Sequence, residues 1–237
     1  MHIFIAQLSR GSIDTRHLDC LAELQRYLDE RGCDSTLARV SRRTNIPAAR
    51  NLLAAEFLKN PEHDLLLWVD DDMTFRPDEM TRMCLEACQL QAIVGAAYAS
   101  KTLPAKLMVD MLPHTEKFTF FEGGSVQRVA GVGTGLVAIP SSVFKALARW
   151  AQKSADGVVS YYDPLFEGGV RYGEDIAFCR RAAKVGVSTY CDSRVRAGHI
   201  GTYEYHVEDC FGARHRYSSV KFEYGAGGVG QSIEGSP

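Results

Sequence analysis

Long apolar runs, a secretory leader and an excess of positive charge are all missing from this sequence. No apolar run approaches the roughly 20 residues that a membrane-spanning helix needs. The start, Met1 to Leu8, has neither the basic region nor the cleavage site of a signal peptide, and it is predicted to form a strand. The formal net charge is -2, so no global field draws the chain to nucleic acid or anionic lipid. We therefore expect a cytoplasmic protein with no transmembrane segment. The basic stretch 39–43 leaves nucleic acid open as a less favoured partner.

Paired cysteine motifs are also missing, because none of the seven cysteines forms a Cys-x-x-Cys. Without an export signal, the cysteines are expected to stay reduced. Cys84 and Cys88 lie one helical turn apart, a spacing that a metal could use. Their apolar neighbours Met83, Leu85 and Ala87 favour two buried helix cysteines instead.

What is present suits one α/β domain. The chain has 237 residues, of which 46% are hydrophobic and 24% charged, which is enough for an ample core. Apolar periodicity and helix start and stop signals predict helices over 14–31, 47–59, 77–90, 141–150 and 174–186. Strands are predicted over 2–8, 34–40, 65–70, 92–97, 106–111, 116–121, 126–130, 136–139 and 187–191. Their alternation in the first half predicts a largely parallel sheet with helices on both faces.

Two segments lack such a pattern. Residues 153–172 are polar and contain glycine, and they are predicted to be a loop. Residues 224–230 are rich in glycine and have little to bury, so they are predicted to be disordered or a mobile flap. No internal repeat and no linker divides the chain.

The run from Leu65 to Asp72 is the most informative part of the sequence. A short apolar stretch predicts a buried strand, and three carboxylates follow at its carboxyl end, where open α/β sheets bind ligands. Adjacent carboxylates repel one another and need a counter-charge, such as a divalent cation that bridges to substrate phosphates. Alternation along extended backbone predicts that Asp70 and Asp72 converge while Asp71 points away. The alternative is an acidic turn before the helix that begins near Pro77.

Further polar features follow the order of the predicted elements. They are Arg50 and Asn51 in the helix before the acid strand, Tyr98 and Lys101 after the next strand, the glycine-rich Gly131–Gly135, the pair Glu174 and Asp175 at a helix start, and His199 at the end of a late strand. Each alone has an ordinary explanation, such as a solvated surface group or a helix cap. The glycines would also let backbone approach a ligand closely.

In this order, over residues 2–201, the features resemble the GT-A glycosyltransferases, in particular the family-2-like group that uses nucleotide-sugar donors. Asp70-x-Asp72 is similar to the metal-binding Asp-x-Asp (DxD) motif of these enzymes, and His199 to the late histidine that completes their metal shell. The resemblance implies one GT-A, Rossmann-like α/β domain over 1–201, with a mixed, mostly parallel sheet flanked by helices. Residues 202–237 would then form a C-terminal flap and flexible tail.

The resemblance also implies an activity and a set of roles. The chain would be a metal-dependent hexosyltransferase that moves a sugar from a nucleotide-diphosphate donor to a hydroxyl of a glycan or other acceptor, with inversion. Mn²⁺ or Mg²⁺ would be held by Asp70, Asp72 and His199, and the imidazole leans the site toward Mn²⁺. The implied donor contacts are Arg50, Asn51, Asp70, Asp71, Lys101 and Gly133. Asp175 would be the general base, with Glu174 as the alternative base or as a group that orients the acceptor.

Two departures from the family pattern leave alternatives open. The first loop, Gln7 to Ser12, lacks the aspartate that reads uracil in many members, so a UDP-sugar is the first expectation but the base is not fixed. The extra C-terminal helices of members that act on membrane-linked acceptors are missing, which favours a soluble or partner-delivered acceptor. A nucleotidyltransferase is less favoured, because the first loop supplies only Arg10-Gly11. A non-catalytic sugar-nucleotide or carbohydrate-binding module is the other alternative.

Overall fold

The computed structural model describes the chain except for residues 10, 42–44, 116, 150, 152, 154–156, 158, 213–218, 226–227 and 231–237. Its α-helices are α1 (Thr15–Asp29), α2 (Ile46–Lys59), α3 (Pro77–Leu90), α4 (Ser141–Leu147) and α5 (Glu174–Lys184). The central sheet contains β1 (His2–Ser9), β2 (Asp34–Ser41), β3 (Leu65–Val69), β5 (Ile93–Ala96), β8 (Val126–Val129), β10 (Leu136–Pro140) and β13 (Thr189–Asp192). No helix among these residues is long and apolar enough to cross a membrane.

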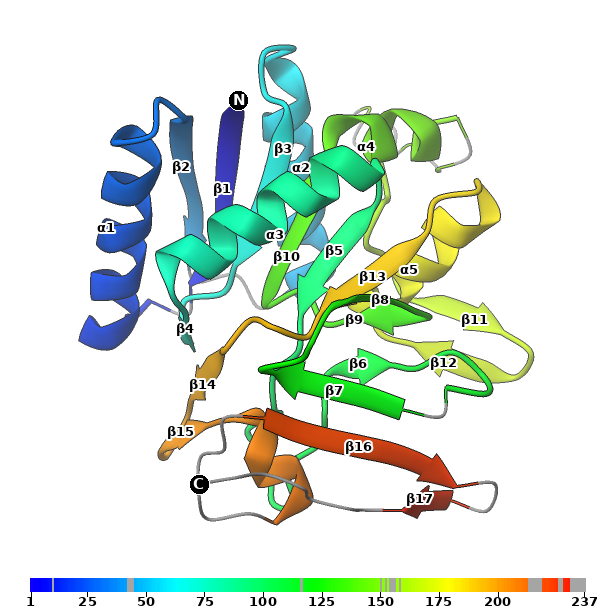
Figure 1. Cartoon of the computed structure of the whole chain (residues 1–237). Coiled ribbons are helices and arrows are strands. Elements are labelled where there is room, and N and C mark those ends of the chain that lie inside the picture. The colour runs from blue at the N-terminus through cyan, green and yellow to red at the C-terminus, as the bar shows by residue number, and fades with distance from the viewer. Residues whose placement is uncertain are drawn as a thin grey trace.

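The central sheet is mostly parallel, with the order β2-β1-β3-β10-β5-β13-β8. Pairings β1–β2, β1–β3 and β5–β13 are parallel, whereas β10 runs antiparallel to both of its neighbours and β8 runs antiparallel to β13. Helices cover both faces, with α1 and α3 in front and α2 behind in Figure 1. The predicted single α/β domain, with a mixed, mostly parallel sheet flanked by helices, is confirmed.

Alternation along β3 builds two cores from one strand. Leu66 and Trp68 pack with α2, α4 and α5, while Leu65, Leu67 and Val69 pack with α1 and α3. Every side chain of β3 is fully buried, as expected for a strand between two helix layers. The same alternation directs the side chain of Asp70, the residue after Val69, toward α2.

Most predicted helices are confirmed within two residues of their ends. In α1 the leucine spacing also predicts that Leu18, Leu21, Leu24 and Leu28 form the buried face, and this prediction was partly wrong. Leu21, Leu24 and Leu28 are buried, whereas Leu18 is 41% exposed. His17 takes the buried place instead, because its Nδ1 atom donates to the Met73 carbonyl at 2.7 Å and its Nε2 atom meets the Gln7 amide. Cys84 is buried as predicted, and Cys88 is partly buried. Helix α4 ends at Leu147, before the predicted 150.

The segment predicted as a loop contains a β-hairpin. Strands β11 (Leu165–Glu167) and β12 (Val170–Tyr172) pair antiparallel around Gly168 and Gly169, which have φ angles of 58° and 78°. Such positive φ angles suit a two-residue hairpin turn that only glycine adopts freely. The strands were missed because three residues are too few to show alternation.

The remaining strands lie along the carboxyl edge of the central sheet or beyond it. They are β4 (Met73–Thr74), β6 (Val109–Asp110), β7 (Lys117–Phe121), β9 (Gly131–Val132), β14 (Gly198–Ile200), β15 (Glu204–Tyr205), β16 (Ser219–Gly225) and β17 (Gly228–Gly230), with a 3-10 helix at Val207–Phe211. Strand β16 pairs with β7 and β17, so part of the expected flap is a sheet strand (Figure 1). Residues 231–237 of the expected tail lie outside the described residues, and the division at residue 201 stays a prediction.

Asn51 fastens α2 to the chain that follows α4. Its side-chain oxygen accepts from the backbone N–H groups of Tyr161 and Tyr162, both at 2.9 Å, and its nitrogen donates to Asp163 at 3.0 Å. Tyr162 in turn accepts from the indole of Trp68 at 2.7 Å. The whole amide of Asn51 is therefore engaged inside the protein, and Asn51 positions this segment.

Asn51→Ala is expected to destabilise the fold by about 3 kcal/mol, because two buried N–H groups lose their acceptor. Urea unfolding followed by circular dichroism measures the change. Asn45→Ala, which removes the cap of α2 at Ala48, serves as the matched control and should cost about 1 kcal/mol. Equal losses in the two variants would contradict the assigned role of Asn51.

Candidate active site

The three acids after β3 lie in a turn and not on extended backbone. Strand β3 ends at Val69, and the N–H of Met73 donates to the Asp70 carbonyl at 3.2 Å. The Asp70 side chain lies toward α2, on the same face as Leu66 and Trp68, while Asp71 and Asp72 line the same pocket beyond the point where the turn begins. The prediction that Asp71 points away was therefore wrong, because strand alternation stops where the turn begins.

Arg50 is the counter-charge of Asp70. Its Nη2 atom donates to both Asp70 oxygens at 3.1 Å, and its guanidinium lies 4.8 Å from the Trp68 ring centroid. Arg50 is only 3% exposed, and its Nε and Nη1 atoms have no hydrogen-bond partner among the described residues. Burial raises the pKa of the Asp70 carboxyl against the opposing effect of Arg50, and the nearby Asp72 raises it further.

Asp72 carries its own pair of basic partners. Lys101 Nζ donates to Asp72 Oδ2, and His199 Nε2 lies 3.5 Å from Asp72 Oδ1. Although burial raises the pKa of Asp72, the contacts with His199 and Lys101 bring it below its ordinary value. The pairing of β14 with β4 brings His199 here, since His199 lies opposite Met73 and Ile200 N donates to the Asp72 carbonyl at 2.7 Å.

The environment of His199 fits a metal ligand. Its Nδ1 atom donates to the Ala99 carbonyl at 2.8 Å, which leaves Nε2 facing the Asp72 carboxylate. Metal-binding histidines have such a carbonyl partner on the second ring nitrogen. Among the described residues, no group of three or more His, Cys, Asp or Glu is placed to hold a metal ion. The fit is therefore to a cation with two protein ligands, whose other ligands are water or phosphate oxygen.

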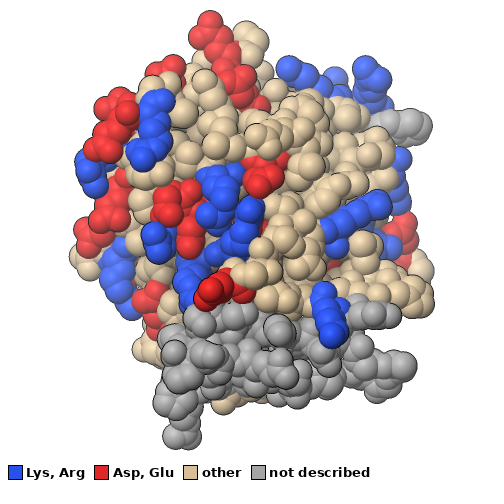
Figure 2. All heavy atoms as spheres, in the orientation of Figure 1, with Lys and Arg blue, Asp and Glu red and all other residues tan. Residues whose placement is uncertain are grey.

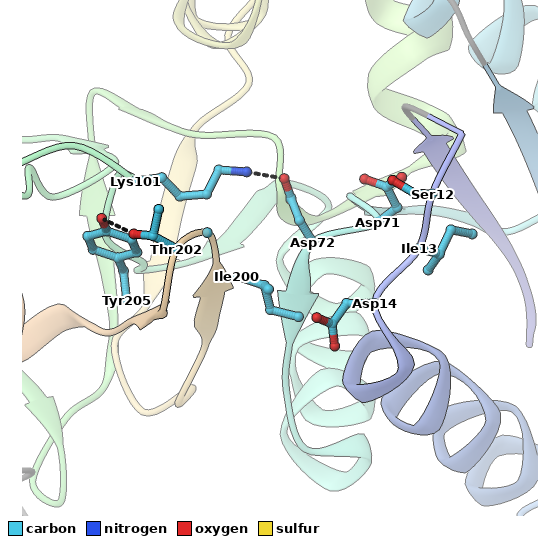
Figure 3. A pocket seen from close by; sticks show the side chains of 10 residues that line it. Ser12, Ile13, Asp14, Asp71, Asp72, Lys101, Ile200, Thr202 and Tyr205 are labelled. Carbon is cyan, nitrogen blue, oxygen red and sulfur yellow. Dashed lines mark hydrogen bonds and ion pairs between the residues drawn. The ribbon is translucent and has the colours of Figure 1, made fainter.

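A pocket of about 600 Å³ opens in front of Asp72 (Figure 3). Loop residues before α1 form one wall, and the turn after β14 forms the other. Its lining residues are Ser12, Ile13, Asp14, Asp71, Asp72, Lys101, Ile200, Gly201, Thr202 and Tyr205. Lys101 reaches toward Asp72 across this pocket in Figure 3. Sequence reasoning missed the loop side chains, and only the helix-capping position of Asp14 gave a local signal for one of them.

Glu174 and Asp175 are the first two residues of α5, and this helix start lies near Asp70. Glu174 Oε1 lies 3.9 Å from Arg50 Nε, so both Asp70 and Glu174 border the same guanidinium. Burial raises the pKa of Glu174, and the nearby Asp175 and Asp70 add to that effect. Asp175 Oδ1 accepts from the Ile176 N–H at 2.7 Å, and no ion pair forms at Asp175 among the described residues. The structure thus brings the acid cluster and the helix-start pair together.

Two glycines of the stretch Gly131–Gly135, Gly133 and Gly135, make room for Tyr98. A Cβ atom at Gly133 would overlap the Tyr98 hydroxyl, and one at Gly135 would lie 2.9 Å from the same ring. The Gly135 N–H donates to that hydroxyl at 3.0 Å, and Tyr98 packs edge-on to His199 with ring centroids 5.4 Å apart. Gly133 therefore leaves space for Tyr98, which packs against His199. This internal packing explains why a glycine stands at position 133.

Gly133→Ala is expected to cost about 1–3 kcal/mol, because the new methyl group must displace the Tyr98 ring. Thermal unfolding measures the loss. Combining it with Tyr98→Phe should reduce the cost, because the hydroxyl that the methyl group meets is gone. Strictly additive losses would contradict this packing explanation.

Comparison with known proteins finds a likeness in fold but none in sequence families. No protein-family model and no curated protein matches the chain in sequence. The solved structure of A197 from STIV matches with a TM-score of 0.56 and 20% identity, over 85% of this chain and 86% of that chain. Lower TM-scores are found for Drosophila beta-1,4-galactosyltransferase 7 with manganese, UDP-Gal and xylobiose (0.39, 13% identity, 86% and 70% coverage). S. aureus TarS gives 0.40 at 12% identity, with 80% and 60% coverage.

Proposed function

We propose that the protein is a metal-dependent glycosyltransferase that moves a sugar from a nucleotide-diphosphate donor to an acceptor hydroxyl. The observation that carries the proposal is the arrangement around Asp72: a carboxylate, an imidazole and an ammonium group meet at the carboxyl end of β3, beside a pocket of about 600 Å³. Ligands of open α/β sheets bind at this edge.

The donor half of the site follows from the charges. A diphosphate would bind beside Lys101, whose ammonium group can leave Asp72 for a phosphate oxygen. Mn²⁺ or Mg²⁺ would be held by Asp72 and His199, with Asp70 nearby, and would offset the charge that develops on the leaving diphosphate. Asp71 and the loop around Ser12 line the pocket that the nucleoside would enter. The resemblance favours a UDP-sugar.

The acceptor half centres on the start of α5. Asp175 would take the proton of the acceptor hydroxyl while that oxygen attacks the anomeric carbon from the face opposite the diphosphate, which gives inversion. The helix N-terminus favours an ionised carboxylate at this position. Glu174, paired with Arg50, borders an open groove and would orient the acceptor. Arg50 keeps Asp70 and Glu174 in place from beneath, since it is almost fully buried.

Thermal shift with nucleotide sugars tests the donor assignment. At about 100 times its Kd, a donor that binds only the folded state should raise Tm by about 5–10 °C. UDP-glucose, UDP-galactose, UDP-N-acetylglucosamine, GDP-mannose and CTP are compared with and without Mn²⁺. Release of nucleoside diphosphate then separates an enzyme from a binding module. A shift with CTP alone, and pyrophosphate release, would indicate a nucleotidyltransferase instead.

A further inference from the structure

The hairpin β11–β12 has one face fixed to the domain and one face exposed. Glu167 forms ion pairs with Arg180 and Lys184 of α5, both at 2.7 Å, and Arg180 lies 4.2 Å above the ring of Tyr172. Glu167 and Tyr172 share a face, because Glu167 pairs with Val170 and Leu165 pairs with Tyr172. The hairpin is therefore anchored to α5 by this side.

The other face presents an aromatic ring to solvent. Phe166 and Arg171 are cross-strand partners, and the Arg171 guanidinium carbon lies 5.9 Å from the Phe166 ring centroid. Phe166 is 74% exposed, although it sits on a hairpin held by ion pairs. Most of this phenyl ring is free of contact with the described part of the fold and is open to a ligand.

Arg171 connects this ring to the groove that borders Glu174. The groove measures about 930 Å³ and is lined by Asn45, Ile46, Pro47, Asp163, Pro164, Arg171, Gly173 and Glu174. Its wall from α2 is apolar, with Ile46 42% exposed. The ionised lining groups are two carboxylates and one guanidinium. A phosphate or carboxylate on the ligand would meet more repulsion than attraction, whereas hydroxyl groups can donate to the carboxylates.

We propose that this groove binds an uncharged saccharide acceptor, with Phe166 packing against the carbon-hydrogen face of a sugar ring. Asp163 and Arg171 would bind ring hydroxyls, and Glu174 would receive the end of the saccharide next to Asp175. The inference rests on the proposed function and names its acceptor class. Flat apolar contact plus a few placed polar groups is the chemistry of such sites. The lining disfavours an acidic sugar or a sugar phosphate as acceptor.

Binding of disaccharides to the wild-type chain tests the groove without any donor. Saturation-transfer NMR is recorded with cellobiose, lactose, maltose and xylobiose, and with glucuronic acid and glucose 6-phosphate as charged probes. At least one neutral disaccharide should bind through its ring protons, and Phe166→Ala should weaken that binding about tenfold. Val170→Ala, on the anchored face of the same hairpin, is the matched control and should leave it unchanged.

The kinetic form of the test uses the full reaction. With the disaccharide that binds, Phe166→Ala should raise the acceptor KM about tenfold, and Phe166→Trp should restore it. Tighter binding of the charged probes, or equal effects of Phe166→Ala and Val170→Ala, would overturn the inference. If the proposed function itself is wrong, the result is different: the wild-type chain will show no donor binding and no release of nucleoside diphosphate.

Discussion

Asp72→Asn is expected to remove the Mn²⁺ dependence of donor binding. In the wild-type chain, Mn²⁺ should tighten the Kd for the matching nucleoside diphosphate on the order of 10²-fold or more, because loss of metal-site groups costs at least that much. The variant loses a charged ligand, so the cation no longer bridges protein and phosphate. Calorimetric titration with and without Mn²⁺ measures the ratio of the two Kd values.

The Asp72–Lys101 contact sharpens this prediction. Removing the charge of Asp72 frees the Lys101 ammonium group for phosphate, so metal-free binding should not weaken in Asp72→Asn. A general loss of structure would instead weaken binding in both conditions. Asp78→Asn, which removes a partly exposed acid beside Arg76, is the matched control and should keep the wild-type ratio. An undiminished Mn²⁺ effect in Asp72→Asn would rule out the metal assignment.

The fold was largely predictable because it depends on local periodicity. The apolar stripe of α1, the continuous apolar run of β3 and the proline at the start of α3 each specify an element within a few residues. The antiparallel course of β10 was not visible, since a buried strand has the same apolar composition in either direction. The hairpin β11–β12 was missed because its strands are only three residues long.

The sequence named most of the polar residues that the structure brings together at the candidate site, but not how they pair. Arg50 was expected at a phosphate, yet it lies under Asp70 against Trp68. The signal was present: Arg50 shares its helix face with Leu53, Ala54 and Phe57, at spacings of three, four and seven residues. An arginine in a buried stripe needs an acidic partner, and the strand-ending, partly buried Asp70 supplies it. The pocket loops carry no periodicity, so their contribution depends on tertiary contacts alone.

Asp175→Asn is expected to lower kcat on the order of 10²-fold or more, as losses of a general base do. The amide keeps the size of the side chain and can still accept from the Ile176 N–H, so α5 should begin as before. It cannot accept the acceptor's proton. Donor Kd should change little, because Asp175 lies beside Glu174 in the part of the site proposed for the acceptor. The control is Asp19→Asn, an exposed acid of α1.

Glu174→Gln separates the two carboxylates. Glu174 contacts Arg50, and its pKa lies above the ordinary glutamate value because of burial, Asp175 and Asp70. A base works only when deprotonated, so activity that depends on Glu174 would fall as pH drops through this raised pKa. If Asp175 is the base, Glu174→Gln should mainly raise the acceptor KM. A kcat that is lost in Glu174→Gln but kept in Asp175→Asn would assign the base to Glu174. Full activity in both variants would leave the pair as a helix N-terminal cap, since neither carboxylate would then touch the reacting hydroxyl.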